Sequence, residues 1–280
     1  MILVTGATGT VGRAVVNLLL EADQKVAAVT RDPASAALPA DAQVVGGDPA
    51  SPETLKSALH GVEAILLSPR AVGDAATELL SLAADAGVQR VVVLSAVSVQ
   101  YGGGYRRFAG EFKAAEDAAS ASGLHPTFLR CADFAANTLA WAPQIRATGV
   151  VRGAYGHAAT SPLHQRDIAE VAVQALLDPL HAGHAYALTG PQSLTQHDKA
   201  RLVGRAIGME LPFEEISPQQ ARQAMLAQGL PEDVPDRLLG YLAACLQQPG
   251  PSTDTVAELL HRPALTFARW ATDHAAAFRN

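Results

Sequence analysis

The chain has 280 residues, of which 49% are hydrophobic and 17% charged, a composition typical of a globular protein rather than a disordered one. Its formal net charge of −6 disfavours a nucleic-acid-binding surface, since the only adjacent arginine pair is Arg106-Arg107. Two cysteines cannot build a disulfide framework, and no apolar run reaches the roughly 18 residues of a membrane span, so we expect a cytoplasmic protein without a membrane partner.

Short apolar runs alternate with helical patterns in the first half of the chain. We expect strands at residues 2–4, 26–29, 44–45, 64–67, 91–94 and 127–129. The helices expected between them lie at about 12–21, 52–60, 74–86 and 108–122, and Ser51 is expected to be the N-cap of the second. This rhythm predicts an α/β fold with a doubly wound parallel sheet of the Rossmann type.

The second half is dominated by helical signals. Asp167 is expected to cap a helix that ends at Leu177, and residues 185–189 to form a strand that returns to the sheet. Two pairs have the spacing of capping boxes: Thr195 with Asp198, and Ser217 with Gln220. Further helices are expected at 196–207, 218–228, 232–247 and 266–278. We therefore place a dinucleotide-binding domain at residues 1–150 and a smaller, mainly helical substrate lobe at residues 151–280.

A glycine-rich loop follows the first strand and leads directly into a helix. Its glycines permit positive φ and close approach of a pyrophosphate, and the helix N-terminus adds free N–H groups and partial positive charge. The spacing is G-x-x-G-x-x-G rather than G-x-G-x-x-G. The residues predicted to bind the dinucleotide here are Thr5, Gly6, Thr8, Gly9, Thr10, Val11 and Gly12.

The end of the second strand indicates which dinucleotide is bound. An acidic residue there would select NAD through the ribose 2′-hydroxyl. This chain has Thr30 and Arg31 instead, a hydroxyl and a planar cation suited to a 2′-phosphate, although Asp32 could pair with Arg31. The alternatives are a solvated Arg31, or an Arg31 that stacks on the adenine of either cofactor. We favour NADP, with NAD as the alternative.

With these motifs, the chain resembles the NmrA-like group of atypical short-chain dehydrogenases and reductases over nearly its whole length. The resemblance rests on TGATGxxG at the N-terminus and on later segments: residues 122–124, 127–130, Phe134, Asn137, 167–169 and 188–190. Cys131 stands where such proteins often have proline. The group contains quinone- and dye-reductase-like enzymes as well as regulators, so the resemblance implies dinucleotide binding without naming a substrate.

Further cofactor contacts are expected at the ends of three strands. Asp48 matches the position that, in the resembling family, hydrogen-bonds the adenine amino group; its alternative role is that of a turn aspartate. Ser68 should pass near the ribose and pyrophosphate. Ser95 lies where ligands bind, beyond the carboxyl ends of the strands. Both serines have the alternative role of simple strand-end caps.

The catalytic pair of typical short-chain dehydrogenases is missing from the sequence. Those enzymes use a tyrosine with a lysine four residues later, which lowers the pKa of the phenol. Here no tyrosine has such a lysine, and Ala109 precedes Lys113 by four residues. Lys113 and Ser95 remain the catalytic candidates, with Lys113 also a candidate cofactor contact.

Two functions fit this pattern. The first is an NADP(H)-dependent oxidoreductase for planar aromatic or quinone-like substrates, including aromatic polyketides, whose reduction gives a delocalised anion that needs little acid help. Water or Lys113 would then supply the proton. The second is a non-catalytic dinucleotide sensor that acts through a protein partner.

Other residues support weaker predictions. Phe134, Asn137 and Trp141 are expected to line the substrate pocket, with ordinary core packing as the alternative. His181 and His184 have a conceivable metal spacing but no third ligand, so we predict no metal site. Cys131 is expected to be a buried, inert thiol. The sequence leaves the oligomeric state open between monomer and dimer.

Overall fold

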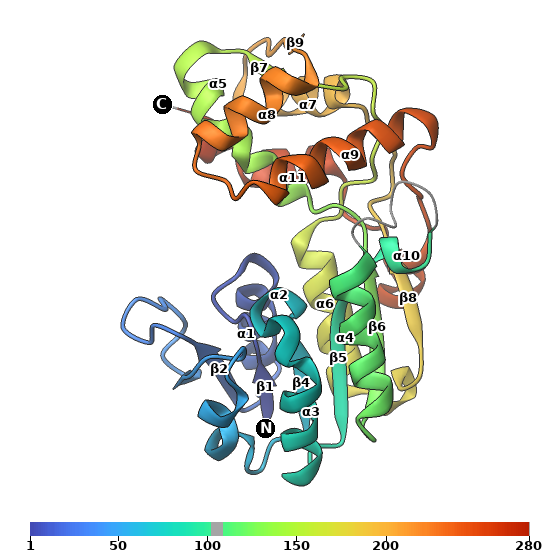
Figure 1. Ribbon diagram of the computed structural model, residues 1–280. Coiled ribbons are helices and arrows are strands. Elements are labelled where there is room, and N and C mark those ends of the chain that lie inside the picture. Colours follow the sequence, from blue (N-terminus) through green and yellow to red (C-terminus); the bar gives the residue numbers. More distant parts are fainter. Residues whose placement is uncertain (102–108, 280) are drawn as a thin grey trace. The chain divides into compact units, whose positions relative to one another are not determined.

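The computed structural model describes residues 1–101 and 109–279, and these contain a seven-stranded sheet that is parallel throughout (Figure 1). Across the sheet, the strands are β3 (Gln43–Gly46), β2 (Val26–Thr30), β1 (Ile2–Val4), β4 (Ala64–Leu67), β5 (Arg90–Ala96), β6 (His125–Cys131) and β8 (Ala185–Leu188). The chain order reverses on either side of β1 and β4, so the predicted doubly wound fold is confirmed.

Helices cover both faces of this sheet. On one face lie α1 (Thr10–Glu21) and α6 (Gln165–Leu177), and on the other η1 (Pro52–Leu59), α3 (Ala76–Asp85) and α4 (Ala109–Ala121) (Figure 1). The central strands β1, β2 and β4 are therefore buried at every residue, which explains their unbroken apolar runs. Short turns of helix follow two strand ends: α2 (Pro69–Val72) with η2 (Gly73–Ala75), and η3 (Val97–Val99).

Three helix expectations need correction. The segment after Ser51 is a 3₁₀-helix rather than an α-helix, and the side chain of Ser51 makes no capping hydrogen bond. The helix α6 begins at Gln165, so Asp167 lies buried in its first turn and does not cap it. The last helix is shorter than expected: α11 (Phe267–Asp273) is followed by the 3₁₀-helix η7 (Ala275–Phe278). Phe108, Arg106 and Arg107 lie outside the described residues.

The contacts divide the described chain into two units. The sheet unit contains residues 1–100, 109–131 and 165–188, and the second unit contains Tyr101 and residues 132–164 and 189–279. These units do not coincide with a single boundary near residue 150. The chain leaves the sheet after β6 and returns through α6 to β8, which pairs with β6, as expected for the strand near 185–189.

The second unit is mainly helical. Its helices are η5 (Ala135–Trp141), α5 (Ala142–Thr148), α7 (Gln196–Ile207), α8 (Pro218–Ala227), α9 (Asp233–Gln247), α10 (Thr255–Leu260), α11 and η7. A small parallel sheet of β7 (Val151–Gly153) and β9 (Phe213–Glu215), not expected from the sequence, accompanies them. Both predicted capping boxes are present, at the starts of α7 and α8.

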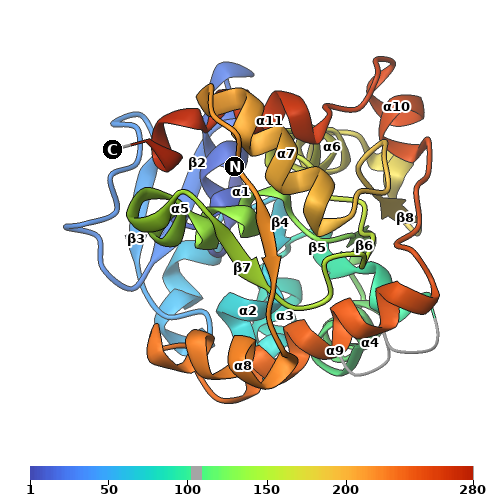
Figure 2. The same cartoon turned by 90° about the horizontal axis from the view of Figure 1, so that it is seen from above.

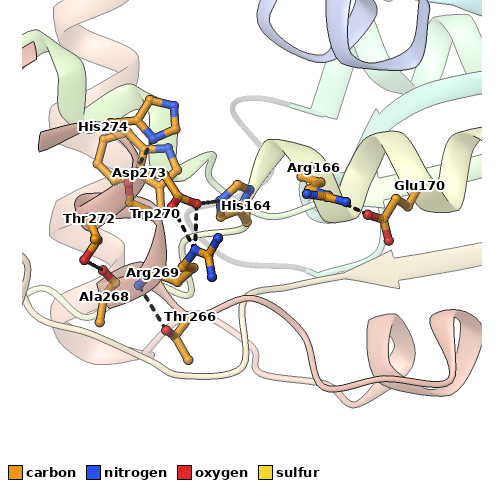
Figure 3. A network of polar contacts seen from close by, with 10 residues as sticks. All are labelled: His164, Arg166, Glu170, Thr266, Ala268, Arg269, Trp270, Thr272, Asp273 and His274. Atoms are coloured by element: carbon orange, nitrogen blue, oxygen red, sulfur yellow. Dashed lines mark hydrogen bonds and ion pairs between the residues drawn. The ribbon is translucent and has the colours of Figure 1, made fainter. Parts of the chain in front are cut away.

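The packing of α11 organises the core of this unit. Figure 2 shows α11 beside α7, and Trp270 of α11 is fully buried against Phe267, with ring centroids 5.3 Å apart. On the same helix, Asp273 accepts hydrogen bonds from Arg269 at 2.8 and 2.9 Å and lies 3.6 Å from Nε2 of His164 (Figure 3). Asp273 therefore brings Arg269 and His164 together at the edge of this core.

Among the described residues, no helix is both long enough and apolar enough to cross a bilayer. Cys131 and Cys245 are free and buried.

The junction between the glycine loop and α1 yields a stability test. A Cβ atom on Gly12 would lie 2.1 Å from the carbonyl oxygen of Gly6, whereas one on Gly110, in α4, would meet nothing within 4 Å. We expect Gly12→Ala to lower the thermal unfolding midpoint clearly. Gly110→Ala should leave it unchanged or raise it, since alanine is favoured over glycine in helices by up to about 1 kcal/mol. Equal midpoints for the two variants would contradict this packing.

Candidate cofactor-binding site

The glycine loop has the geometry needed to receive phosphate groups. Gly6 has a φ of +64°, which favours glycine, and its carbonyl oxygen accepts a hydrogen bond from the Gly9 N–H at 3.0 Å. Gly9 is the N-cap of α1, where no side chain caps the helix and no acidic residue lies in the first turn. The N-terminus of α1 thus keeps its N–H groups and partial positive charge for an anion.

Thr5 and Ser68 fix the loop to the neighbouring strand. The Thr5 hydroxyl donates to the Leu66 carbonyl at 2.8 Å and accepts from the Ser68 N–H at 2.8 Å. A Cβ on Gly6 would lie 3.2 Å from the Cβ of Ser68, so the Ser68 side chain sits directly against the loop. Thr5 is buried, and its two hydrogen bonds support the loop; its predicted contact with the dinucleotide stays a prediction.

A cavity of about 310 Å³ opens beside the loop, entirely within the sheet unit. Four predicted binding residues line it: Gly6, Thr8, Thr30 and Arg31. Arg70 and Ala71 of α2 line it as well, as does Pro49, next to Asp48. Its position beyond the carboxyl ends of β1, β2 and β4 is where the adenosine half of a dinucleotide binds in such folds.

Asp32 does not neutralise Arg31. Its carboxylate accepts hydrogen bonds from the Ala34 N–H at 3.2 Å, from the Ser35 N–H at 3.4 Å and from the Ser35 hydroxyl. The Ser35 hydroxyl bond is the main reason that the pKa of Asp32 lies below its usual value. Arg31 makes no ion pair with any described residue, so its guanidinium is available to a ligand.

A second arginine, not anticipated from the sequence, joins the two walls of the cavity. Arg13 of α1 donates to the Ala36 carbonyl at 3.0 Å, to the Thr8 carbonyl at 3.4 Å and to the Ala37 carbonyl. Since Thr8 and Ala36 both line the cavity, this side chain ties the glycine loop to the loop after β2. Its partners are neutral, so its charge adds to the positive potential nearby.

Asp48 takes the conformation of a turn aspartate. One carboxylate oxygen accepts from the Ala50 N–H at 3.0 Å, and the Asp48 N–H donates to Thr54. The side chain is half-buried. Its predicted contact with the adenine amino group stays a prediction.

Ser95 belongs to a buried charged network beneath the ends of β5 and β6. Its hydroxyl donates to Glu116 of α4 at 2.5 Å, and Arg130 donates to both oxygens of the same carboxylate at 3.0 and 2.7 Å. Ser95 and Arg130 face each other in the β5–β6 register, so both reach the face that α4 covers. Glu116 raises the pKa of Arg130, chiefly through these hydrogen bonds. The single proton of Ser95 is therefore committed to Glu116.

Lys113 and Cys131 differ in how accessible they are. The Lys113 side chain is 55% exposed and pairs with Asp117 one turn further along α4. Cys131 is buried, and burial raises the pKa of its thiol to about 12. Cys131 is thus neutral at ordinary pH, as expected for an inert thiol.

The residues predicted to line a substrate pocket lie in the second unit. Phe134 is half-buried and precedes η5, and Asn137 is exposed. Trp141 packs on Phe213 with ring centroids 6.3 Å apart, at the edge of the cluster around Trp270. This environment for Trp141 matches the core-packing alternative, and the pocket itself stays a prediction.

Three features fit NADP(H): the glycine loop, the N-terminus of α1 without a capping side chain, and a cavity lined by arginines without carboxylate partners. Together they define a dinucleotide-binding protein of the Rossmann type. Comparison with known proteins agrees. A family model described as NAD(P)H-binding matches residues 6–179.

Two relatives are each 37% identical over 99% of this chain and 99% of their own. They are a (4-alkanoyl-5-oxo-2,5-dihydrofuran-3-yl)methyl phosphate reductase of Streptomyces griseus and an NAD(P)H azoreductase of Xenophilus azovorans. A solved structure of the NADPH-dependent quinone oxidoreductase of Escherichia coli, complexed with NADPH, superposes with a TM-score of 0.83. It is 28% identical, over 98% of this chain and 99% of that one.

The chain therefore belongs to the NAD(P)H-binding family, and within it to the NmrA-like quinone and dye reductases that its motifs resemble. It is an NAD(P)H-dependent oxidoreductase. Of the two functions considered from the sequence, this is the enzyme rather than the sensor.

The free guanidinium of Arg31 generates a test of cofactor choice. A charge-assisted contact to a 2′-phosphate contributes roughly 1.5–3 kcal/mol, or about 10- to 150-fold in affinity. We expect Arg31→Ala to weaken NADPH binding by this factor and NADH binding much less, measured by fluorescence titration. If both cofactors were weakened alike, Arg31 would not be the phosphate ligand.

The buried network generates a test of stability with a neighbouring control. Removing one partner of a buried ion pair costs about 3–5 kcal/mol, and Glu116→Ala should fall near the lower end, since Arg130 keeps some solvent contact. Asp117→Ala, which breaks the exposed pair with Lys113, should cost less than about 1 kcal/mol. Urea unfolding of both variants measures this difference, and equal losses would refute it.

Proposed function

We propose that this protein uses NADPH to reduce planar, conjugated acceptors such as quinones, azo compounds and aromatic polyketides, without a tyrosine–lysine acid pair. Bound NADPH supplies a hydride to the acceptor. The single observation that carries the proposal is that no tyrosine of the sequence has a lysine four residues later, while the hydroxyl of the strand-end candidate Ser95 donates to Glu116.

The two catalytic candidates support this reading through their surroundings. Ser95 donates its only proton to Glu116. Lys113 is exposed and paired with Asp117. Neither arrangement resembles a phenol whose pKa is lowered by a neighbouring ammonium group, the device that ketone reduction by typical short-chain enzymes requires.

Acceptor chemistry explains how such a site can still be effective. Hydride addition to an isolated ketone leaves a localised, strongly basic alkoxide that must be protonated at once. Addition to a quinone, an azo group or a doubly activated alkene leaves an anion spread over several atoms, which solvent can protonate later. Holding the acceptor in the reactive orientation then supplies most of the rate acceleration.

The acceptors named for the relatives fit this class. One is an azo compound, one a quinone, and one a dihydrofuran ring that carries both an alkanoyl and an oxo group. All three provide conjugation that delocalises negative charge. We extend the class to this chain and propose the cytoplasm as its compartment, since its two cysteines are free thiols.

A substrate panel tests the class directly. We expect NADPH oxidation with a quinone, an azo dye and an α-acyl butenolide to exceed by at least about 100-fold that with an unconjugated ketone of similar size. The reason is that a dedicated general acid contributes about 10² to 10⁴, which this site lacks for the ketone. Comparable rates with the ketone would contradict the proposal.

Two substitutions test the absence of a dedicated acid. Ser95→Ala and Lys113→Ala should each lower kcat with a quinone by less than about 100-fold. Steady-state kinetics at saturating NADPH measures this. A fall of about 10⁴-fold for either variant would identify that residue as a true acid–base group.

A further inference from the structure

Arg70 lines the same cavity as Arg31 but comes from a different part of the sheet unit. Arg31 follows β2, whereas Arg70 lies in α2, just after β4. Both strands pair with β1, one on each side. The two arginines therefore reach the cavity from segments that follow the two neighbours of β1.

Neither guanidinium has an ion-pair partner within residues 1–101 and 109–279. Both side chains are exposed. The one carboxylate that lines the cavity, Asp32, is held by its own loop. Two planar cations thus line the cavity without a counter-charge, an arrangement that stabilises the empty protein very little and is suited to a ligand.

A planar guanidinium group stacks favourably on the face of an aromatic ring such as a purine. Arg70 therefore offers the cavity a stacking partner for the base of a dinucleotide.

We propose that Arg70 stacks on the adenine ring of the cofactor, while Arg31 takes the 2′-phosphate. The phosphate groups have other expected partners. The pyrophosphate lies by the N-terminus of α1, and the 2′-phosphate by Arg31, next to Thr30 at the end of β2. Arg70 contacts the adenine ring, which NADPH and NADH share. It therefore contributes affinity without selecting between them.

Titration of NADPH and NADH against Arg70→Ala and Arg70→Lys tests this role without relying on turnover. Stacking on a base contributes about 1–3 kcal/mol, or roughly 5- to 150-fold in affinity. We expect Arg70→Ala to weaken both cofactors by the same factor within this range. Arg70→Lys should weaken both nearly as much, because an ammonium keeps the charge but not the plane.

Three results would overturn the proposal: a loss confined to NADPH, which would make Arg70 a 2′-phosphate ligand; full recovery with Arg70→Lys, which would make it a point charge for the pyrophosphate; or no change. Arg166→Ala, at an exposed arginine of α6 paired with Glu170, is the matched control and should alter neither affinity. Because the readout is binding, failure here leaves the proposed acceptor class untouched, and the converse also holds.

Discussion

The sheet unit depends on one close approach, between the carbonyl group of Gly6 and the backbone of Gly12. No side chain can occupy that space, since a Cβ on Gly12 would lie 2.1 Å from the carbonyl oxygen. This approach brings the start of α1 directly over the end of β1, so the helix N–H groups point toward the site where phosphates bind. The same packing leaves α1 without a capping side chain, which a ligand anion can replace.

The charged groups of this unit follow a consistent division. Beneath the sheet ends, the buried Glu116 and the partly buried Arg130 neutralise each other through two hydrogen bonds. Around the cavity the arginines are left without carboxylate partners: Arg13 is held by carbonyl groups, and Arg31 and Arg70 by no described charge. A charge is costly to bury alone but cheap to leave at a solvated rim. The unpaired cations therefore mark the place where an anionic ligand is expected.

The sequence predicts the sheet well, because its strands are covered on both faces and read as unbroken apolar runs. The capping boxes at Thr195 and Ser217 are equally local and are confirmed. The strands β7 and β9 were missed, since three residues such as Phe213–Glu215 carry too little periodicity to stand out. The 3₁₀ geometry of η1 was missed because the pattern that marks a helix start does not distinguish α from 3₁₀.

The residues of the candidate site also divide into those that the sequence predicts and those that it does not. The glycine loop and Arg31 are visible in the sequence because their roles follow from a motif and a strand end. The Glu116–Arg130 pair and the contact of Arg13 with Ala36 were not found, because they join residues 14 and 23 positions apart in the chain. Arg70 was not found because it stands out only as part of the cavity lining. One signal was available for Arg70: it follows a strand end by three residues, like other ligand-facing positions in this fold.

The network that stabilises the ends of β5 and β6 also restricts the chemistry. If Ser95 donated its proton to an acceptor, the Glu116 carboxylate would lose one of its three hydrogen bonds in a buried setting. That loss would cost about 1–3 kcal/mol at the moment when a proton donor is meant to lower the barrier. Reduction of a ketone needs such a donor, so it would lack acid catalysis or carry the cost of the lost hydrogen bond. Reduction of a conjugated acceptor needs no donor and carries neither cost. The same hydrogen bonds that hold the strands together therefore favour acceptors that carry their own means of dispersing charge.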